Sequence, residues 1–126
     1  MNSPALSFSI VDDDLSFGKS LKRMLNARGI PADYFGSAQS FLDSVPASQS
    51  GYAVVDIHMP ACDGFALMGK MKEMRYRMPV IVITGQAQTD ARDLAMRVGA
   101  VGYLQKPFGA ESLLEIVLKH EAENGS

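Results

Sequence analysis

Short apolar runs alternate with longer amphipathic stretches along the whole chain. The run VIVI at 80–83 has the length and β-branched content of a buried strand, whereas apolar residues within 91–98 recur at the i, i+3, i+4, i+7 spacing of one helix face. This pattern predicts five strands, over residues 6–11, 32–35, 52–56, 79–83 and 101–104. It also predicts five helices, over residues 14–27, 37–45, 63–76, 89–98 and 111–119. Strands that alternate with helices are typical of a doubly wound α/β domain with a parallel sheet.

The predicted helix ends carry residues that favour them. Asp14 and Ser37 are suited to accept hydrogen bonds from free N–H groups at helix starts, and Gly29 and Gly99 are suited to end the helices before them. The tail from His120 to Ser126 is expected to be frayed, and its histidine to have no role. Residues 1–126 are therefore predicted to form one domain, folded from about 5 to 120.

Composition narrows the class of protein. A chain of 126 residues with 47% apolar and 21% charged residues is typical of a single globular domain. A net charge of −2 argues against direct nucleic-acid binding, which depends on a basic surface. No apolar run is long enough to span a membrane, and the first residues do not resemble a signal peptide. The single cysteine, Cys62, excludes an internal disulfide, so a cytoplasmic location is expected.

Polar side chains fall where four of the predicted strands end. Asp12 and Asp13 follow the first strand, Asp56 ends the third, Thr84 follows the fourth and Lys106 follows the fifth. In a doubly wound sheet of order 2-1-3-4-5, ligands bind outside the carboxyl ends of the strands, beside the crevice between strands one and three. We therefore expect these five side chains to converge on one pocket.

The residue types in this pocket suggest phosphoryl chemistry. Neighbouring carboxylates repel by roughly 4 kcal/mol per pair at about 4 Å and an effective dielectric near 20. Hard oxygen ligands suit Mg²⁺, whose charge would offset that repulsion. A carboxylate can also accept a phosphoryl group as an aspartyl-phosphate, and a cation, an ammonium and a hydroxyl could each meet one phosphoryl oxygen. The sequence therefore predicts a site that receives a phosphoryl group on an aspartate.

Four segments carry a family resemblance: VDDD at 11–14, VVDIHMPACDG at 54–64, VIVITG at 80–85 and GAVGYLQKPF at 99–108. In this order and at these spacings, the chain resembles the receiver domain of bacterial two-component response regulators over nearly its whole length. The resemblance implies a flavodoxin-like (βα)5 fold, with a five-stranded parallel sheet in order 2-1-3-4-5 and helices on both faces. It also implies a signalling switch that takes a phosphoryl group from a histidine kinase and promotes its own phosphorylation and slow dephosphorylation, without being an enzyme.

The resemblance also assigns roles around the phosphoacceptor. It implies that Asp56 is the acceptor, and that Asp12 and Asp13 hold Mg²⁺, Asp13 directly and Asp12 mainly through water. Asp56 and the backbone carbonyl of His58 would complete the protein ligands. The His58 side chain is expected to face solvent.

The remaining assignments concern the switch and its output. The resemblance implies that Lys106 contacts the phosphoryl group, that the Lys106–Pro107 bond is cis, and that Thr84 and Tyr103 move together on phosphorylation. This movement would reshape the face formed by the fourth helix, fifth strand and fifth helix. The partner on that face would be an output domain or protein, or a second receiver in a dimer.

Three other functions fit parts of the pattern. A haloacid-dehalogenase-like aspartyl phosphatase could use Asp12 and Asp14 as its Asp-x-Asp motif, but it needs an acidic pair after the lysine, and no Asp follows Lys106. A flavodoxin-like FMN carrier shares the strand order, but three aspartates in its first loop would repel the phosphate. A degenerate receiver that only binds proteins would not need the complete set of acids, hydroxyl and lysine.

Overall fold

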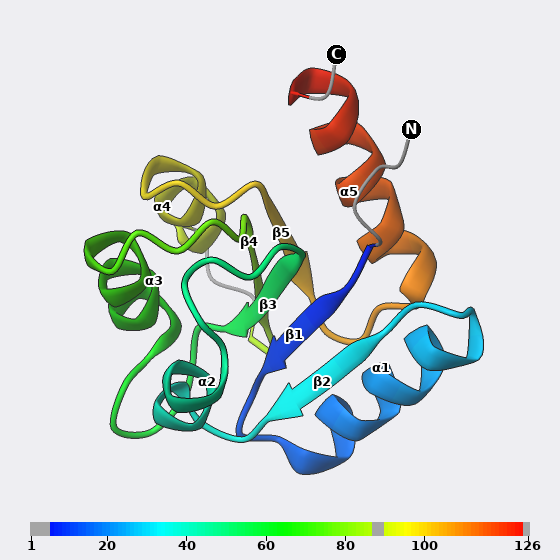
Figure 1. Ribbon diagram of the computed structural model, residues 1–126, viewed down its shortest axis with the longest axis horizontal. Coiled ribbons are helices and arrows are strands. Elements are labelled where there is room, and N and C mark those ends of the chain that lie inside the picture. Colours follow the sequence, from blue (N-terminus) through cyan, green and yellow to red (C-terminus); the bar gives the residue numbers. More distant parts are fainter. Residues whose placement is uncertain (1–5, 87–89, 125–126) are drawn as a thin grey trace.

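The computed structural model describes residues 6–86 and 90–124 and contains the predicted alternation of strands and helices (Figure 1). The strands are β1 (Phe8–Val11), β2 (Ala32–Phe35), β3 (Tyr52–Asp56), β4 (Val80–Thr84) and β5 (Gly102–Gln105). The helices are α1 (Leu15–Ala27), α2 (Ala38–Ser44), α3 (Gly64–Glu73), α4 (Ala91–Arg97) and α5 (Ala110–Asn124). The predicted start of the fourth helix, Thr89, lies outside the described residues.

The strands form one sheet in the order β2-β1-β3-β4-β5, and every neighbouring pair is parallel. The predicted fold class is therefore confirmed. Strands β1, β3 and β4 are buried along their whole length, as expected for a parallel sheet that helices cover on both faces. The registers place Val11 opposite Val55 and Asp56 opposite Ile83, so the carboxyl ends of the three central strands lie at one edge.

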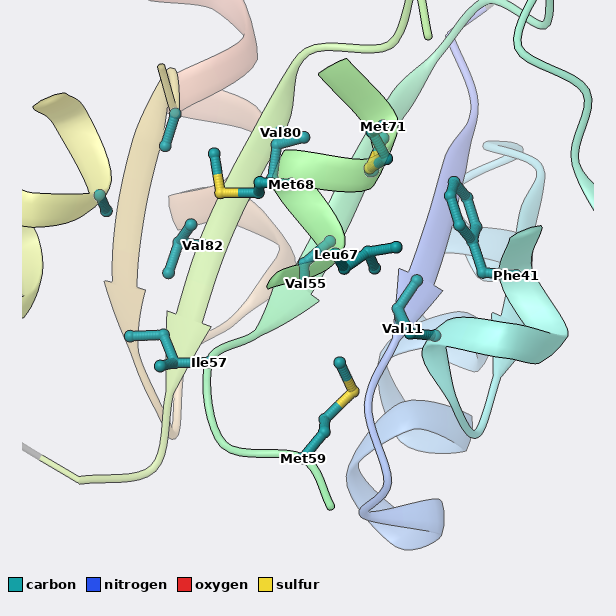
Figure 2. Packing of buried hydrophobic residues seen from close by; sticks show 14 of the residues in the cluster. Val11, Phe41, Val55, Ile57, Met59, Leu67, Met68, Met71, Val80 and Val82 are labelled. Atoms are coloured by element: carbon teal, nitrogen blue, oxygen red, sulfur yellow. The ribbon is translucent and has the colours of Figure 1, made fainter. Parts of the chain in front are cut away.

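Each face of the sheet buries its own apolar cluster. On one face, strand residues pack against α2, α3 and α4, as Figure 2 shows for Val55, Phe41 and Leu67. On the other face, strand residues pack against α1 and α5, where Leu21 and Leu113 are fully buried. Burying one such side chain contributes about 1.5–3 kcal/mol. The two faces therefore stabilise the sheet, and the strand ends are left to carry polar chemistry.

Local signals at the helix ends act as predicted. Asp14 and Ser37, and also Asp63, for which no cap was predicted, each accept a hydrogen bond from the backbone N–H three residues further on, at 3.1, 3.1 and 2.8 Å. Each bond satisfies one of the N–H groups that a helix start leaves free. Gly29 and Gly99 follow α1 and α4 with φ of 77° and 108°, a left-handed conformation that glycine adopts without steric cost.

Two predicted helix ends are wrong, and both errors have a structural cause. Helix α3 ends at Glu73 rather than near Tyr76, because Arg75 takes a left-handed φ of 62°. Helix α5 continues past the predicted end at residue 119 to Asn124, so the expectation of a frayed tail from residue 120 onward is wrong for the part of the tail that the structure describes.

The extension of α5 packs against the amino end of β3. The hydroxyl of Tyr52 lies 2.7 Å from Nδ1 of His120 and donates a hydrogen bond of 2.5 Å to Glu121. The rings of Tyr52 and His120 also meet edge to face, with centroids 5.5 Å apart. His120 therefore has a structural role, which the sequence interpretation did not assign to it.

Candidate functional site

Three carboxylates meet at the carboxyl ends of β1 and β3. Asp12 and Asp13 follow β1, and Asp56 ends β3, the neighbouring strand. One oxygen from each of the three lies within 4.8 Å of the others, so together they could hold a metal ion. Asp12 and Asp56 are buried, at 0% and 4% exposure, whereas Asp13 is exposed and leaves the group open to solvent.

The Asp12 carboxylate is only partly satisfied. Its Oδ1 accepts a hydrogen bond of 2.9 Å from the N–H of Asp14. Its Oδ2 lies 2.7 Å from Nζ of Lys106, but the approach is poorly directed for a hydrogen bond, and no other described residue supplies one. Burial, reinforced by the nearby charge of Asp56, raises the pKa of Asp12 to about 6, although Lys106 and the Asp14 N–H oppose the rise. A charged Asp12 is therefore held at an energetic cost.

Lys106 provides the positive charge of the site. Its ammonium lies 2.7 Å from Asp12 and 3.2 Å from Asp56, and 4.4 Å from the centre of the Phe17 ring. Its backbone N–H donates to the carbonyl of Thr84 at 2.7 Å, and the peptide bond to Pro107 is cis, as predicted. Burial lowers the pKa of Lys106, but the two carboxylates raise it by more, so the ammonium stays charged.

Asp56 is also held by the loop that follows it. The N–H of His58 donates to Oδ1 of Asp56 at 3.0 Å, while the His58 side chain is exposed, as expected. The loop then folds closely over the strand end. A Cβ at Gly64 would lie 2.5 Å from the Asp56 carbonyl oxygen, so only glycine fits there. This loop also contains Cys62, which is half-buried.

The two predicted switch residues lie on neighbouring strands. Thr84 ends β4 and is fully buried, and its hydroxyl donates to the carbonyl of Gln86 at 3.0 Å and accepts from the Gln86 N–H at 3.1 Å. Tyr103 on β5 is half-buried and packs against the cluster under α2, α3 and α4. The Thr84 hydroxyl therefore lies at the expected strand end but is bonded to its own turn.

The sequence interpretation missed two aromatic residues at this site. Phe17 lies beneath the Lys106 ammonium, and the hydroxyl of Tyr34 donates to the carbonyl of Asp12 at 2.6 Å. Burial, followed by the charges of the three aspartates, raises the pKa of Tyr34. The signal that could have pointed to Tyr34 is Gly18 in the first helix, because glycine allows the backbone to approach another group closely, and a Cβ there would lie 2.1 Å from the Tyr34 ring.

A comparison with models of protein families shows to which family the chain belongs. The model of the response regulator receiver domain matches residues 8–118, which include every candidate site residue. The chain belongs to this family. The expected family is thus confirmed, and neither the aspartyl phosphatase nor the FMN carrier is favoured.

Curated relatives of this receiver domain are longer proteins. The transcriptional regulatory protein FixJ of Bradyrhizobium diazoefficiens is 34% identical over 108 residues, which cover 86% of this chain and 53% of FixJ. The DNA-binding transcriptional regulator NtrC of Klebsiella pneumoniae is 35% identical over 108 residues, which cover 86% of this chain and 23% of NtrC. The receiver domain described here therefore spans about half of the first relative and less of the second.

Solved structures agree on the fold of the receiver domain. The crystal structure of FixJ-N has a TM-score of 0.82 at 32% identity, covering 92% of this chain and 93% of that one. A CheY-like receiver domain protein from Methanospirillum hungatei also has a TM-score of 0.82, at 28% identity, covering 95% and 96%. In the described part of this receiver domain, no helix is both long and apolar enough to cross a membrane.

Proposed function

We propose that this receiver domain accepts a phosphoryl group on Asp56 and uses it as a signalling switch. The observation that carries the proposal is the convergence at Asp56. The Lys106 ammonium lies 3.2 Å from one of its oxygens, and oxygens of Asp12 and Asp13 lie within 4.8 Å of it. A nucleophilic carboxylate, a cation and a group of acidic metal ligands are the parts that phosphoryl transfer to an aspartate requires.

The acidic group fits Mg²⁺. Mg²⁺ prefers one or two carboxylates with several waters, and the exposed Asp13 leaves space for water beside two buried carboxylates. Asp12 Oδ2 supports this fit, because it is a buried acceptor that no described residue provides with a well-directed hydrogen bond. Asp12, Asp13 and Asp56 would hold the ion together with the His58 carbonyl. When bound, Mg²⁺ supplies positive charge for the phosphoryl oxygens and offsets the repulsion among the acids.

The phosphoryl donor is proposed to be the phosphohistidine of a histidine kinase. One oxygen of Asp56 forms the new P–O bond as the P–N bond of the donor breaks. The released imidazole keeps the electron pair and takes up a proton. Lys106 contributes a positive charge beside the transferred group, and the chain thereby promotes its own phosphorylation. Water later attacks the acyl phosphate, which restores the Asp56 carboxylate and releases phosphate.

The switch is proposed to start at Thr84. Its hydroxyl is bonded to the Gln86 backbone in this structure. A phosphoryl group on Asp56 offers a charged acceptor, and hydrogen bonds to charged groups contribute about 1.5–3 kcal/mol. If Thr84 turns toward it, Tyr103 can turn into the vacated space and reshape the α4-β5-α5 face. That face would bind an output domain or protein, or a second receiver, in the cytoplasm.

The test is direct chemical phosphorylation. Incubated with acetyl phosphate and Mg²⁺, the protein should gain one acid-stable, base-labile phosphoryl group, seen as a mass increase of the intact chain. Asp56→Asn should abolish it, and so should chelation of the metal. Asp14→Asn is the matched control: it changes a member of the same acidic triplet, but Asn caps a helix as well as Asp does, so labelling should persist. Undiminished labelling of Asp56→Asn would place the acceptor elsewhere, at Asp12 or Asp13.

A further inference from the structure

The turn between β1 and α1 must hold charges that repel. Asp12, Asp13 and Asp14 are consecutive, and one oxygen from each of the first two lies within 4.8 Å of Asp56. Asp13 is exposed, so a rotation of the peptide between Asp12 and Asp13 would let its carboxylate move away into water. Some contact must oppose this rotation if the group is to be assembled before a cation arrives.

Strand β2 holds both backbone groups of Asp12. The Asp12 N–H donates to the carbonyl of Phe35 at 3.1 Å, which extends the pairing of β1 with β2. The Asp12 carbonyl accepts the 2.6 Å hydrogen bond from the hydroxyl of Tyr34, the residue just before Phe35. That carbonyl belongs to the Asp12–Asp13 peptide. The phenol therefore holds the peptide plane, whose rotation about the bonds to the flanking Cα atoms would displace Asp13.

The Tyr34 ring is itself fixed by α1. A Cβ at Gly18 would lie 2.1 Å from Cε1 of the ring, so the helix passes directly over the ring where it has no side chain. The N–H of Gly18 donates to the carbonyl of Asp14 at 2.9 Å, which connects the same helical turn to the acidic triplet. The ring therefore has little freedom to swing its hydroxyl away from Asp12.

We propose that Tyr34 is a positioning residue for the metal ligands: its hydroxyl fixes the Asp12–Asp13 peptide, so that the Asp13 carboxylate faces Asp12 and Asp56 before the cation binds. The proposal rests on the proposed function, because it concerns the same Mg²⁺ site. The phenol touches neither the cation nor the reacting atoms. Its effect is to preorganise the acidic group, which lowers the ordering cost of binding.

The test is the Mg²⁺ affinity of Tyr34→Phe, measured by calorimetric titration of the protein without phosphodonor. The substitution removes only the hydroxyl and leaves the ring under Gly18. We expect a roughly two- to tenfold weaker affinity, the range that one net hydrogen bond represents. Acetyl phosphate labelling should need correspondingly more Mg²⁺ and return to the wild-type rate at saturation, because the acceptor and Lys106 are intact.

Tyr76→Phe is the matched control. Its hydroxyl also donates to a backbone carbonyl at 2.6 Å, that of Val45, and the residue is half-buried as Tyr34 is. Tyr76→Phe should lower the free energy of unfolding about as much as Tyr34→Phe does, but it should leave the Mg²⁺ affinity unchanged. Equal affinities of Tyr34→Phe and wild type would overturn the positioning role, and so would equal weakening in both variants. Wild-type protein that binds no Mg²⁺ would instead overturn the metal site, and the proposed function with it.

Discussion

The two ends of the sheet treat buried polar groups in opposite ways. At the carboxyl ends, Asp12 and Asp56 share one ammonium, and one oxygen of Asp12 receives no well-directed hydrogen bond from the residues that the structure describes. At the amino end of β3, the buried Tyr52 hydroxyl is bonded to both His120 and Glu121. Burial raises the pKa at both ends, for Asp12 to about 6 and for Tyr52 with a further contribution from Glu121.

This difference indicates that groups at one end of the sheet serve stability, whereas groups at the other end serve function. A phenol is neutral at pH 7, so burying Tyr52 with two partners costs little and connects β3 to α5. A carboxylate is charged at pH 7, so burying Asp12 with incomplete partners costs stability unless a ligand supplies charge. Natural proteins keep a buried charge with incomplete partners mainly where function needs it. This contrast supports the proposed site at the carboxyl ends of the strands, whereas the contact at the amino end of β3 serves the structure.

The largest test of this contrast is Asp12→Asn. It removes the buried charge with little change of volume, so the metal-free protein should become more stable at pH 7, by about 1–3 kcal/mol for a pKa raised from 3.8 to about 6. Mg²⁺-dependent labelling with acetyl phosphate should fall at least about tenfold, as expected when a charged metal ligand is lost. Urea unfolding and labelling of the same preparation measure both effects. A less stable Asp12→Asn would show that the carboxylate stabilises the fold.

The pH dependence of the free energy of unfolding should also reveal the raised pKa of Asp12. The folded pKa of Asp12, about 6, is above its unfolded value of 3.8, so the folded chain binds the proton more tightly. The resulting stabilisation is complete below about pH 4 and is lost as pH rises to about 6. Subtracting the profile of Asp12→Asn from that of wild type isolates this contribution, which should fall by up to about 3 kcal/mol across the window. A flat difference profile in metal-free buffer would contradict the raised pKa.

Most of the candidate site could be predicted from the sequence because its residues follow strands. Parallel strands bring their carboxyl ends to one edge, so placing the strands also placed Asp12, Asp56, Thr84 and Lys106. The observed strands differ from the predicted ones by no more than two residues at either end. Errors of that size do not move a side chain to another edge of the sheet.

The remaining features depend on contacts between distant segments. Tyr34 approaches Asp12 because β2 pairs with β1, and nothing in its own neighbourhood in sequence indicates which group its hydroxyl meets. The end of α5 depends on Tyr52, 68 residues from His120, so local propensity could not predict that the helix continues to Asn124. The roles of Thr84 and Tyr103 concern a change between two states, and they stay predictions.

The variant Thr84→Ala tests whether the carboxyl end acts on the rest of the domain. Labelling at Asp56 should persist, but the charged hydrogen bond that favours the switched state would be lost. That bond is worth about 1.5–3 kcal/mol, a shift of about ten- to a hundredfold in a two-state equilibrium. Amide NMR shifts of residues 90–119, with and without a beryllofluoride mimic, measure the coupling. Thr84→Ser keeps the hydroxyl and should respond like wild type. An unchanged response of Thr84→Ala would remove this hydroxyl from the switch.

The smallest expected effect is that of Tyr52→Phe at the amino end. The variant keeps the ring against Phe8 and removes the hydroxyl that reaches His120 and Glu121. The Glu121 side chain is 62% exposed and can turn to water, so the loss should be near the net value of one hydrogen bond, about 1 kcal/mol. Faster amide hydrogen exchange should be confined to the last turns of α5, near residues 118–124.

The same variant should leave Mg²⁺ affinity and acetyl phosphate labelling at their wild-type values. Tyr52 and Asp56 are the first and last residues of β3, and the strand between them is fully buried on both faces. A rigid strand can transmit a displacement only if its packing shifts, and removing one hydroxyl whose partners can be hydrated gives no cause for such a shift. Weaker Mg²⁺ binding in Tyr52→Phe would therefore mean that the two ends of β3 are energetically coupled, and that the contact made by α5 contributes to the proposed phosphoacceptor site.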